Sequence, residues 1–354
     1  MRGKDMGGGK GMTAIEQNWK RTLYMYVDQC NKSKVAPETE IYTGSLAAAG
    51  AGAGQRERGR RLADWYAERE ITPRRCETGV KVLSAVARFP GEISAVAELH
   101  SAFFYEKGGI VHREDRVERE LLAFSYDSDG NWQLHEAERH LPERRSPGQF
   151  EGRLPAGMPD YGRDEYRPSL PGPLLSRKVT GISSREIRYR REDAAMYADR
   201  WWDGFNPEFE TFAVDCTNYV SQCIFAGGAP INYTGKRETG WWYKGYIGGR
   251  EEWSFSWAVS DSLRRYLDGE RSTGLRAEAV ESPQQLMLGD VIQYDWDGNG
   301  RFQHSTIVTA FDAGGMPLVN AHTVPSRHRY WDYKDSYAWT DRTVYRFFHI
   351  YDYL

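Results

Sequence analysis

Apolar residues recur at helical spacing in the first part of the chain. Over residues 13–32 they fall three or four positions apart, which predicts an amphipathic helix. Residues 43–54 are rich in Gly and Ala and predict a low-complexity loop. A second helix is predicted over residues 55–69. Its apolar side carries Leu62, Trp65 and Tyr66.

Strand-like runs follow the two helices. They cover residues 80–88, 93–106 and 116–126, and the turn at 127–130 leads into a further run at 131–134. Helices followed by a strand meander predict an α+β domain. Its outline is similar to that of cone-shaped NTF2-like or cystatin-like domains. Such a domain could position a substrate or partner, and a packing role without any ligand is equally open.

Composition divides the chain into parts. Prolines interleaved with Gly, Arg and Glu mark a linker over residues 141–186, because this composition does not form a packed core. We therefore predict a disordered extension over 1–12, an α+β accessory domain over 13–140 and a catalytic domain over 187–354. Either Met1 or Met12 fits as the start.

Further patterns predict the elements of the second domain. A helix that carries Ala194, Tyr197 and Trp201 opens it, another follows Asp215, and a third is predicted over 254–267. β-rich runs are predicted at 288–294, 304–309 and 317–323. The fold class is therefore α+β in both domains.

Composition and charge limit the function. The chain has 354 residues, of which 40% are hydrophobic, so two globular cores are feasible. The net charge of −3 argues against nucleic acid as a partner. No apolar stretch is long enough for a membrane span, and no secretory signal is recognisable. The default location is cytoplasmic, with unconventional export or spore association as alternatives.

Cys216 is the strongest candidate for chemistry. It follows Asp215 at the start of a predicted helix, where unpaired N–H groups favour a thiolate. His304 begins a later strand, and a Cys on a helix followed by a His on a strand is a papain-like order. Strand alternation places Asn320 and His322 on one face, and either residue could orient the imidazole.

These residues resemble a known family. The segments 189–198, 215–222 and 289–292, together with His304-Ser305 and residues 320–323, are similar to the putative amidase domain of Gram-positive bacteria. That family is related to the NlpC/P60 and CHAP cysteine peptidases. The resemblance covers roughly residues 187–348. It implies a papain-like fold for the C-terminal domain.

The resemblance also implies a mechanism. Cys216 corresponds to the nucleophile and His304 to the general base, with Asn320 favoured over His322 as the third residue. Asp215 is expected to cap the helix, and an N–H near its start, in the vicinity of Thr217, to hold the oxyanion. The implied activity is cysteine-dependent cleavage of an amide bond, with cell-wall peptides as one substrate class. An acyltransferase using the same residues and a non-enzymatic binding or sporulation-associated protein are the alternatives.

Two further patterns bear on ligands. Trp241, Trp242 and Trp253 lie between the two catalytic candidates in sequence and could line a substrate groove, although burial is the usual fate of Trp. Residues 295–300 match the first half of a calcium loop but lack the Glu expected at its twelfth position, where Thr306 stands. We therefore predict no metal and no cofactor.

Overall fold

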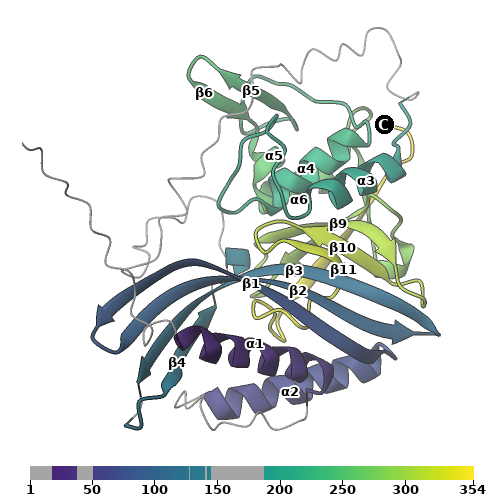
Figure 1. Cartoon of the computed structure of the whole chain (residues 1–354). Helices are drawn as coiled ribbons and strands as arrows, with labels where there is room; N and C mark the ends of the chain where they lie inside the picture. The colour runs from purple at the N-terminus through teal and green to yellow at the C-terminus, as the bar shows by residue number, and fades with distance from the viewer. Residues whose placement is uncertain (1–17, 38–50, 127, 140–141, 145–186) are drawn as a thin grey trace, which may run out of the picture.

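The computed structural model describes residues 18–37, 51–126, 128–139, 142–144 and 187–354 (Figure 1). The predicted extension at 1–12 and nearly all of the predicted linker at 141–186 lie outside these residues.

The N-terminal part consists of two helices and a meander of four strands. The helices and strands are α1 (Trp19–Val35), α2 (Ala51–Glu68), β1 (Thr72–Phe89), β2 (Glu92–Lys107), β3 (Ile110–Tyr126) and β4 (Trp132–Arg139). Both predicted helices and all four predicted strand runs are confirmed. The predicted loop at 43–54 is wrong for its last four residues, which begin α2, while the rest lies outside the described residues. Ala has a high helix propensity, so the Ala residues at the start of α2 permit a helix there. Burial of the apolar side later in the same helix stabilises it.

The strands of this meander arch over α1 and α2 (Figure 1). Trp19 and Leu23 of α1 pack against Ile93, Leu122 and Phe124 of the sheet, all of them buried. On α2, Leu62, Trp65 and Tyr66 are buried as predicted. The apolar side of each helix therefore forms the core beneath the sheet.

Four helices lie together in the C-terminal part. They are α3 (Arg191–Trp201), α4 (Cys216–Ala226), α5 (Phe255–Ala258) and α6 (Ser260–Asp268). The single helix predicted over 254–267 is interrupted at Val259, which adopts an extended conformation with φ −116° and ψ 121°. β-branched side chains lose rotamer freedom in a helix, so Val is suited to such a break.

Strands from both parts of the chain form one antiparallel sheet. The C-terminal strands in it are β7 (Ala277–Val280), β8 (Val291–Asp295), β9 (His304–Phe311), β10 (Pro317–Ala321), β11 (Ser326–Tyr330) and β12 (Val344–Ile350). The sheet order is β1-β2-β3-β11-β10-β9-β8-β12-β7, with β4 on β3. A separate hairpin pairs β5 (Tyr243–Ile247) with β6 (Arg250–Trp253). The mixed α and β composition confirms the predicted class in this general form.

The two parts meet where β3 pairs with β11, at Arg116 opposite Ser326. Buried polar contacts reinforce this junction: Arg116 pairs with Asp335, and Trp65 Nε1 donates to Asp332 Oδ2 at 2.9 Å. A 3₁₀ turn, Pro142–Arg144, places Glu143 3.4 Å from Arg329. The division into accessory and catalytic domains remains a prediction, and the two parts share one hydrogen-bonded layer.

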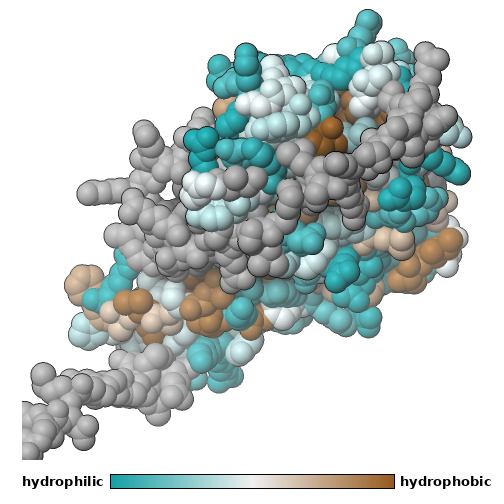
Figure 2. Space-filling model, turned by 90° about the horizontal axis from the view of Figure 1, so that it is seen from above, coloured by the Kyte–Doolittle hydropathy of each residue, from teal (hydrophilic) through white to brown (hydrophobic). Residues whose placement is uncertain are grey.

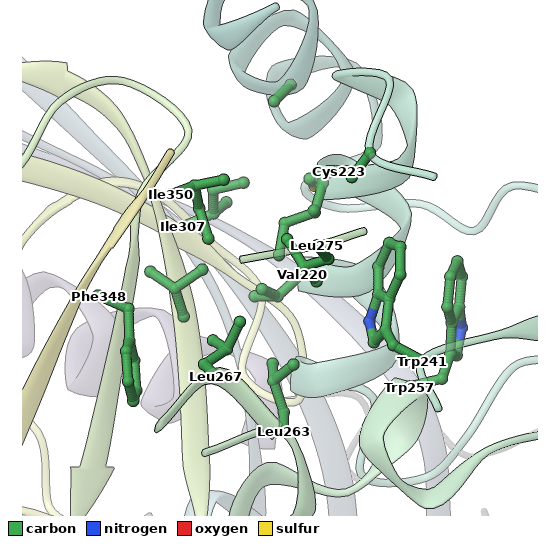
Figure 3. Packing of buried hydrophobic residues seen from close by; sticks show 14 of the residues in the cluster. Val220, Cys223, Trp241, Trp257, Leu263, Leu267, Leu275, Ile307, Phe348 and Ile350 are labelled. Atoms are coloured by element: carbon green, nitrogen blue, oxygen red, sulfur yellow. The ribbon is translucent and has the colours of Figure 1, made fainter. Parts of the chain in front are cut away.

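The strands β8, β9 and β10 have two different faces. On the side we call the helical face, Ile307 lies in one core cluster with Val220 of α4 and Leu267 of α6 (Figure 3). Val291 belongs to the same cluster. On the opposite side, the aromatic face, lie Tyr294, Trp296 and Tyr333. Successive residues of a strand point to opposite faces, so this division decides which side chains can reach Cys216.

Candidate active site

Cys216 is the first residue of α4 and is 2% exposed. Its Sγ lies 3.8 Å from Thr217 Oγ1 and 3.9 Å from the carbonyl oxygen of Gln303. Burial raises the pKa of the thiol, and hydrogen bonds from the Ser305 backbone, Thr217 and Thr323 oppose that rise. Desolvation therefore outweighs the lowering of this pKa that was predicted from the helix terminus.

Asp215 does not cap α4 with its side chain, which corrects the prediction. Its Oδ1 accepts hydrogen bonds from the backbone N–H of Phe212 at 3.0 Å and from Asn218 Nδ2 at 2.9 Å. Its Oδ2 lies 2.7 Å from His322 Nδ1. Asp215 thus ties the loop before the helix to an imidazole.

His322 directly follows the last residue of β10, and its ring lies beside the start of α4. Its Nδ1 donates to Asp215 and its Nε2 donates to the carbonyl oxygen of Trp201 at 2.6 Å. Tyr219 stacks on the ring at a centroid distance of 3.9 Å, and Phe205 meets it edge-on at 5.3 Å. Asp215 and the carbonyl group of Trp201 thus hold both nitrogens of the ring.

His304 lies on the aromatic face, and the predicted approach of its imidazole to Cys216 is not observed. The ring is fully buried between Tyr294, Trp296 and Tyr333, and neither nitrogen has a hydrogen-bond partner. Burial, with a smaller contribution from the Arg329 charge, lowers its pKa from 6.5 to about 3. Strand alternation explains the difference, because the neighbouring Ser305 takes the position that faces α4.

Asn320 shares the helical face with His322, as strand alternation predicts, but it does not bond to an imidazole ring. Its Oδ1 accepts from Thr309 Oγ1 at 2.8 Å and from the backbone N–H of His328 at 2.8 Å. Its Nδ2 donates to Asp199 Oδ1 at 2.9 Å. Asn320 therefore joins β10 to β9, β11 and α3.

Thr217 belongs to a buried hydroxyl cluster rather than to an exposed oxyanion position. Its Oγ1 lies 3.1 Å from Ser305 Oγ, which lies 2.9 Å from Ser260 Oγ. Gln293 Nε2 also donates to Ser305 Oγ at 2.9 Å. This cluster fixes the start of β9 against α4 and α6.

Two residues of the site were not anticipated from the sequence. Thr323 Oγ1 accepts the backbone N–H groups of Asp215 and Cys216, each at 3.1 Å, and so performs the capping expected of Asp215. Ser305 faces Cys216 where His304 was expected. No local pattern marks either residue, because both contacts join segments that are far apart in the sequence.

Of the three tryptophans predicted for a groove, two are core residues. Trp241 and Trp242 are buried, and their Nε1 atoms donate to Ser221 and to the carbonyl oxygen of Thr239. Trp253 is half-buried, and its Nε1 donates to Glu210 Oε2 at 2.7 Å. The Arg237 guanidinium lies over its ring at 3.7 Å. Of the three tryptophans, Trp253 alone is partly exposed.

The loop after β8 closes on itself. Asp295 Oδ1 accepts the N–H of Asp297 at 3.2 Å, and Oδ2 accepts that of Gly300 at 2.6 Å. Within the described part of the chain, no group of three or more His, Cys, Asp or Glu side chains is arranged for a metal ion. None of the described helices is long and apolar enough to cross a membrane.

Known proteins were compared with the chain. Residues 188–348 match the family described as "Putative amidase domain". A Bacillus subtilis protein, "Uncharacterized protein YhbB", is 49% identical over 168 residues, which are 48% of this chain and 52% of the relative. The chain thus spans about half the length of this relative. No solved structure matches the present chain. The match to the putative amidase domain model lies in the C-terminal part of the chain, where the motifs indicated the resemblance.

Proposed function

We propose that residues 188–348 hydrolyse an amide bond with Cys216 as the nucleophile and His322 as the acid–base residue. The observation that carries this proposal is the meeting of a Cys at the first position of α4 with the Asp215–His322 pair at the same helix end. The family description supports amide hydrolysis. A papain-like fold is part of the proposal, since α4 packs on the antiparallel strands β9 and β10.

His322 is preferred to His304 because of where each ring lies. His322 bonds to the residue next to Cys216, whereas His304 is on the other face of the sheet among aromatic rings. Asp215 holds Nδ1 of His322 and would stabilise the imidazolium, the role that a carboxylate plays in a catalytic triad. Asn320 would support β10 behind His322.

The proposed chemistry has two steps. The Cys216 thiolate attacks the amide carbonyl carbon, a C–S bond forms, and the C–N bond breaks as the His322 imidazolium gives its proton to the leaving amine. Neutral His322 then takes a proton from water, whose oxygen attacks the thioester carbon; the C–S bond breaks and releases the acid and the Cys216 thiolate, with His322 again an imidazolium. The carbonyl oxygen of Trp201 lies 2.6 Å from Nε2, so the proposal requires this contact to break before Nε2 can give a proton to the leaving amine.

The proposed substrates are peptide amides, with cell-wall peptides as the first class to test. Phe212 meets the ring of Trp253 edge-on at 5.1 Å, three residues before Asp215. Phe212 and Trp253 would thus form a wall beside the chain that leads to Cys216. An acyltransferase would use the same thioester and differ only in the acceptor that attacks it.

Trapping of the acyl-enzyme tests this function. The full chain is incubated with a panel of peptide amides that includes cell-wall stem peptides, and the released amine and the mass of the protein are followed. We expect Cys216→Ala to abolish both amine release and the acyl adduct, while Cys223→Ala, which removes the other α4 thiol, retains them. Added hydroxylamine would divert the product if the enzyme passes the acyl group to amines. Amine release that persists in Cys216→Ala would refute the proposal.

A further inference from the structure

Thr323 has an unusual backbone conformation beside the site. Its φ is +80°, in the left-handed region that β-branched residues rarely adopt. The residue lies in the turn between β10 and β11, directly after His322. Strained backbone persists where surrounding contacts hold it, and here those contacts are made by the side chain.

The hydroxyl of Thr323 is fully engaged as an acceptor. Its oxygen accepts the N–H of Asp215 and the N–H of Cys216, both at 3.1 Å. A hydroxyl offers two lone pairs and one proton, so two accepted bonds leave only the proton free to be donated. Two donors also polarise the O–H bond and strengthen the hydrogen bond that it can give.

Thr323 Oγ1 lies 3.1 Å from the backbone nitrogen of Cys216, which places the hydroxyl beside the residue that carries the sulfur. The Thr323 side chain lowers the pKa of the thiol, as do the Ser305 backbone and Thr217, against the larger rise caused by burial. Thr217 Oγ1 is shared with Ser305 Oγ, whereas Thr323 has no other side-chain partner among the described contacts. Neither His304 nor His322 directs a ring nitrogen to the sulfur in this structure.

We infer that Thr323 is a positioning residue for Cys216: its hydroxyl accepts the two N–H groups at the start of α4 and donates its proton to the sulfur. The hydroxyl thereby stabilises the thiolate before any imidazole reaches it. This inference rests on the proposed nucleophilic role of Cys216. A purely structural role, in which Thr323 only caps the helix, makes a different prediction for the thiol.

The test is the pH dependence of iodoacetamide alkylation at Cys216, resolved by mass spectrometry in the full chain. The midpoint of the profile reports the thiol pKa, whereas local opening of the buried site scales the rate at every pH. Thr323→Val keeps the shape of the side chain and removes the hydroxyl, and Thr323→Ser restores the hydroxyl. Thr306→Val, which removes a buried hydroxyl on the aromatic face, is the matched control.

We expect the midpoint to rise in Thr323→Val and to stay at the wild-type value in Thr323→Ser and Thr306→Val. Below both midpoints the rate would fall about tenfold for each unit of rise. A Thr323→Val midpoint equal to that of the wild type, or a Thr323→Ser midpoint as high as that of Thr323→Val, overturns the inference. Labelling of the buried Cys223 reports unfolding, in which case Thr323→Ala replaces Thr323→Val and the same comparison decides.

This experiment needs no substrate, so it is independent of the test of amide hydrolysis. A raised midpoint in Thr323→Val with no amine release from any substrate would retain the positioning of the thiol and reject the hydrolase. Amine release that depends on Cys216, together with an unchanged midpoint in Thr323→Val, would retain the hydrolase and reject the positioning of the thiol by Thr323.

Discussion

Two neighbouring residues of β9, His304 and Ser305, point to opposite faces of the same sheet and meet opposite surroundings. Ser305 lies on the helical face, where Thr217, Ser260 and Gln293 all reach its hydroxyl. His304 lies on the aromatic face, where neither of its nitrogens has a partner. A buried polar group without a partner keeps its full desolvation cost. The difference shows that the helical face is built for polar chemistry and the aromatic face for packing.

The two imidazoles of the region differ in the same way. His322 has a hydrogen-bond partner at each ring nitrogen, whereas His304 has none and its lowered pKa keeps that ring neutral. Only a ring that exchanges protons near neutral pH can serve as an acid and base. Experiments on each face test this contrast.

Replacing the two histidines one at a time should give the largest difference in the rate of hydrolysis. We expect His322→Gln to lower amide hydrolysis by about 10²- to 10⁴-fold, since general acid–base catalysis contributes that much. His304→Phe should retain hydrolysis within a few-fold, because an apolar ring fits among Tyr294, Trp296 and Tyr333. Initial rates of amine release in the two variants measure the effect.

The control for this exchange is His349→Gln. His349 of β12 makes a similar contact, 2.8 Å from Nδ1 to Asp290 Oδ2, with a carboxylate other than Asp215, and the His349→Gln variant should retain hydrolysis. Loss of hydrolysis in His304→Phe with a wild-type rate in His322→Gln would reverse the assignment of the base.

The buried ion pairs of Arg329 beside the aromatic face should give the next largest effect, which is on stability. Arg329 is buried, lies 3.7 Å over the Tyr333 ring and pairs with Glu143 and Asp335. Arg329→Leu leaves both carboxylates without this partner, and we expect a loss of about 3–5 kcal/mol in the free energy of unfolding. Urea denaturation measures the loss.

Arg327→Leu is the matched control, because the Arg327–Asp199 pair is partly exposed and should contribute less than about 1 kcal/mol. Equal losses in the two variants would show that burial of the Arg329 pair adds nothing.

Much of this arrangement could be predicted from the sequence. Helical spacing located α1, α2, α3 and α4, and the β-rich runs located the strands, because each pattern follows from burial of one side of an element. Cys216 at the start of a helix followed from Asp215 and the apolar residues after it. Asn320 and His322 share a face because their spacing matches the two-residue repeat of a strand.

The remaining features depend on tertiary contacts that no local pattern encodes. Whether His304 or Ser305 faces α4 is decided by the register of β9 against β8, in which Gln293 pairs with Ser305. The capping role passed from Asp215 to Thr323 because the turn after β10 reaches the start of α4, a contact more than a hundred residues apart in sequence. The joining of the two parts in one sheet likewise depends on the pairing of β3 with β11.

Acid should destabilise the protein through His304. The pKa of His304 is about 3 in the folded protein and 6.5 as its ordinary value, so below pH 6.5 the unfolded chain binds a proton that the folded ring refuses. Stability should therefore fall as the pH falls, by about 2 kcal/mol from this residue on the way to about pH 5. His304→Phe should remove that part of the slope, which urea denaturation at several pH values measures. Parallel slopes in the wild type and the variant would contradict the neutral state of His304.

The smallest effect should come from the hydroxyl groups on the two faces. Ser305→Ala removes the group that Thr217, Ser260 and Gln293 share, and we expect a loss of about 1–2 kcal/mol because buried partners are left with fewer bonds.

Thr306→Val should cost less than about 1 kcal/mol, since Val has the same shape and Tyr294 Oη keeps its bond to the carbonyl oxygen of Trp331 at 2.6 Å. Urea denaturation of both variants at neutral pH measures the difference. A larger loss in Thr306→Val than in Ser305→Ala would mean that the aromatic face depends on its few polar contacts more than the helical face does, and the contrast between the faces would fail.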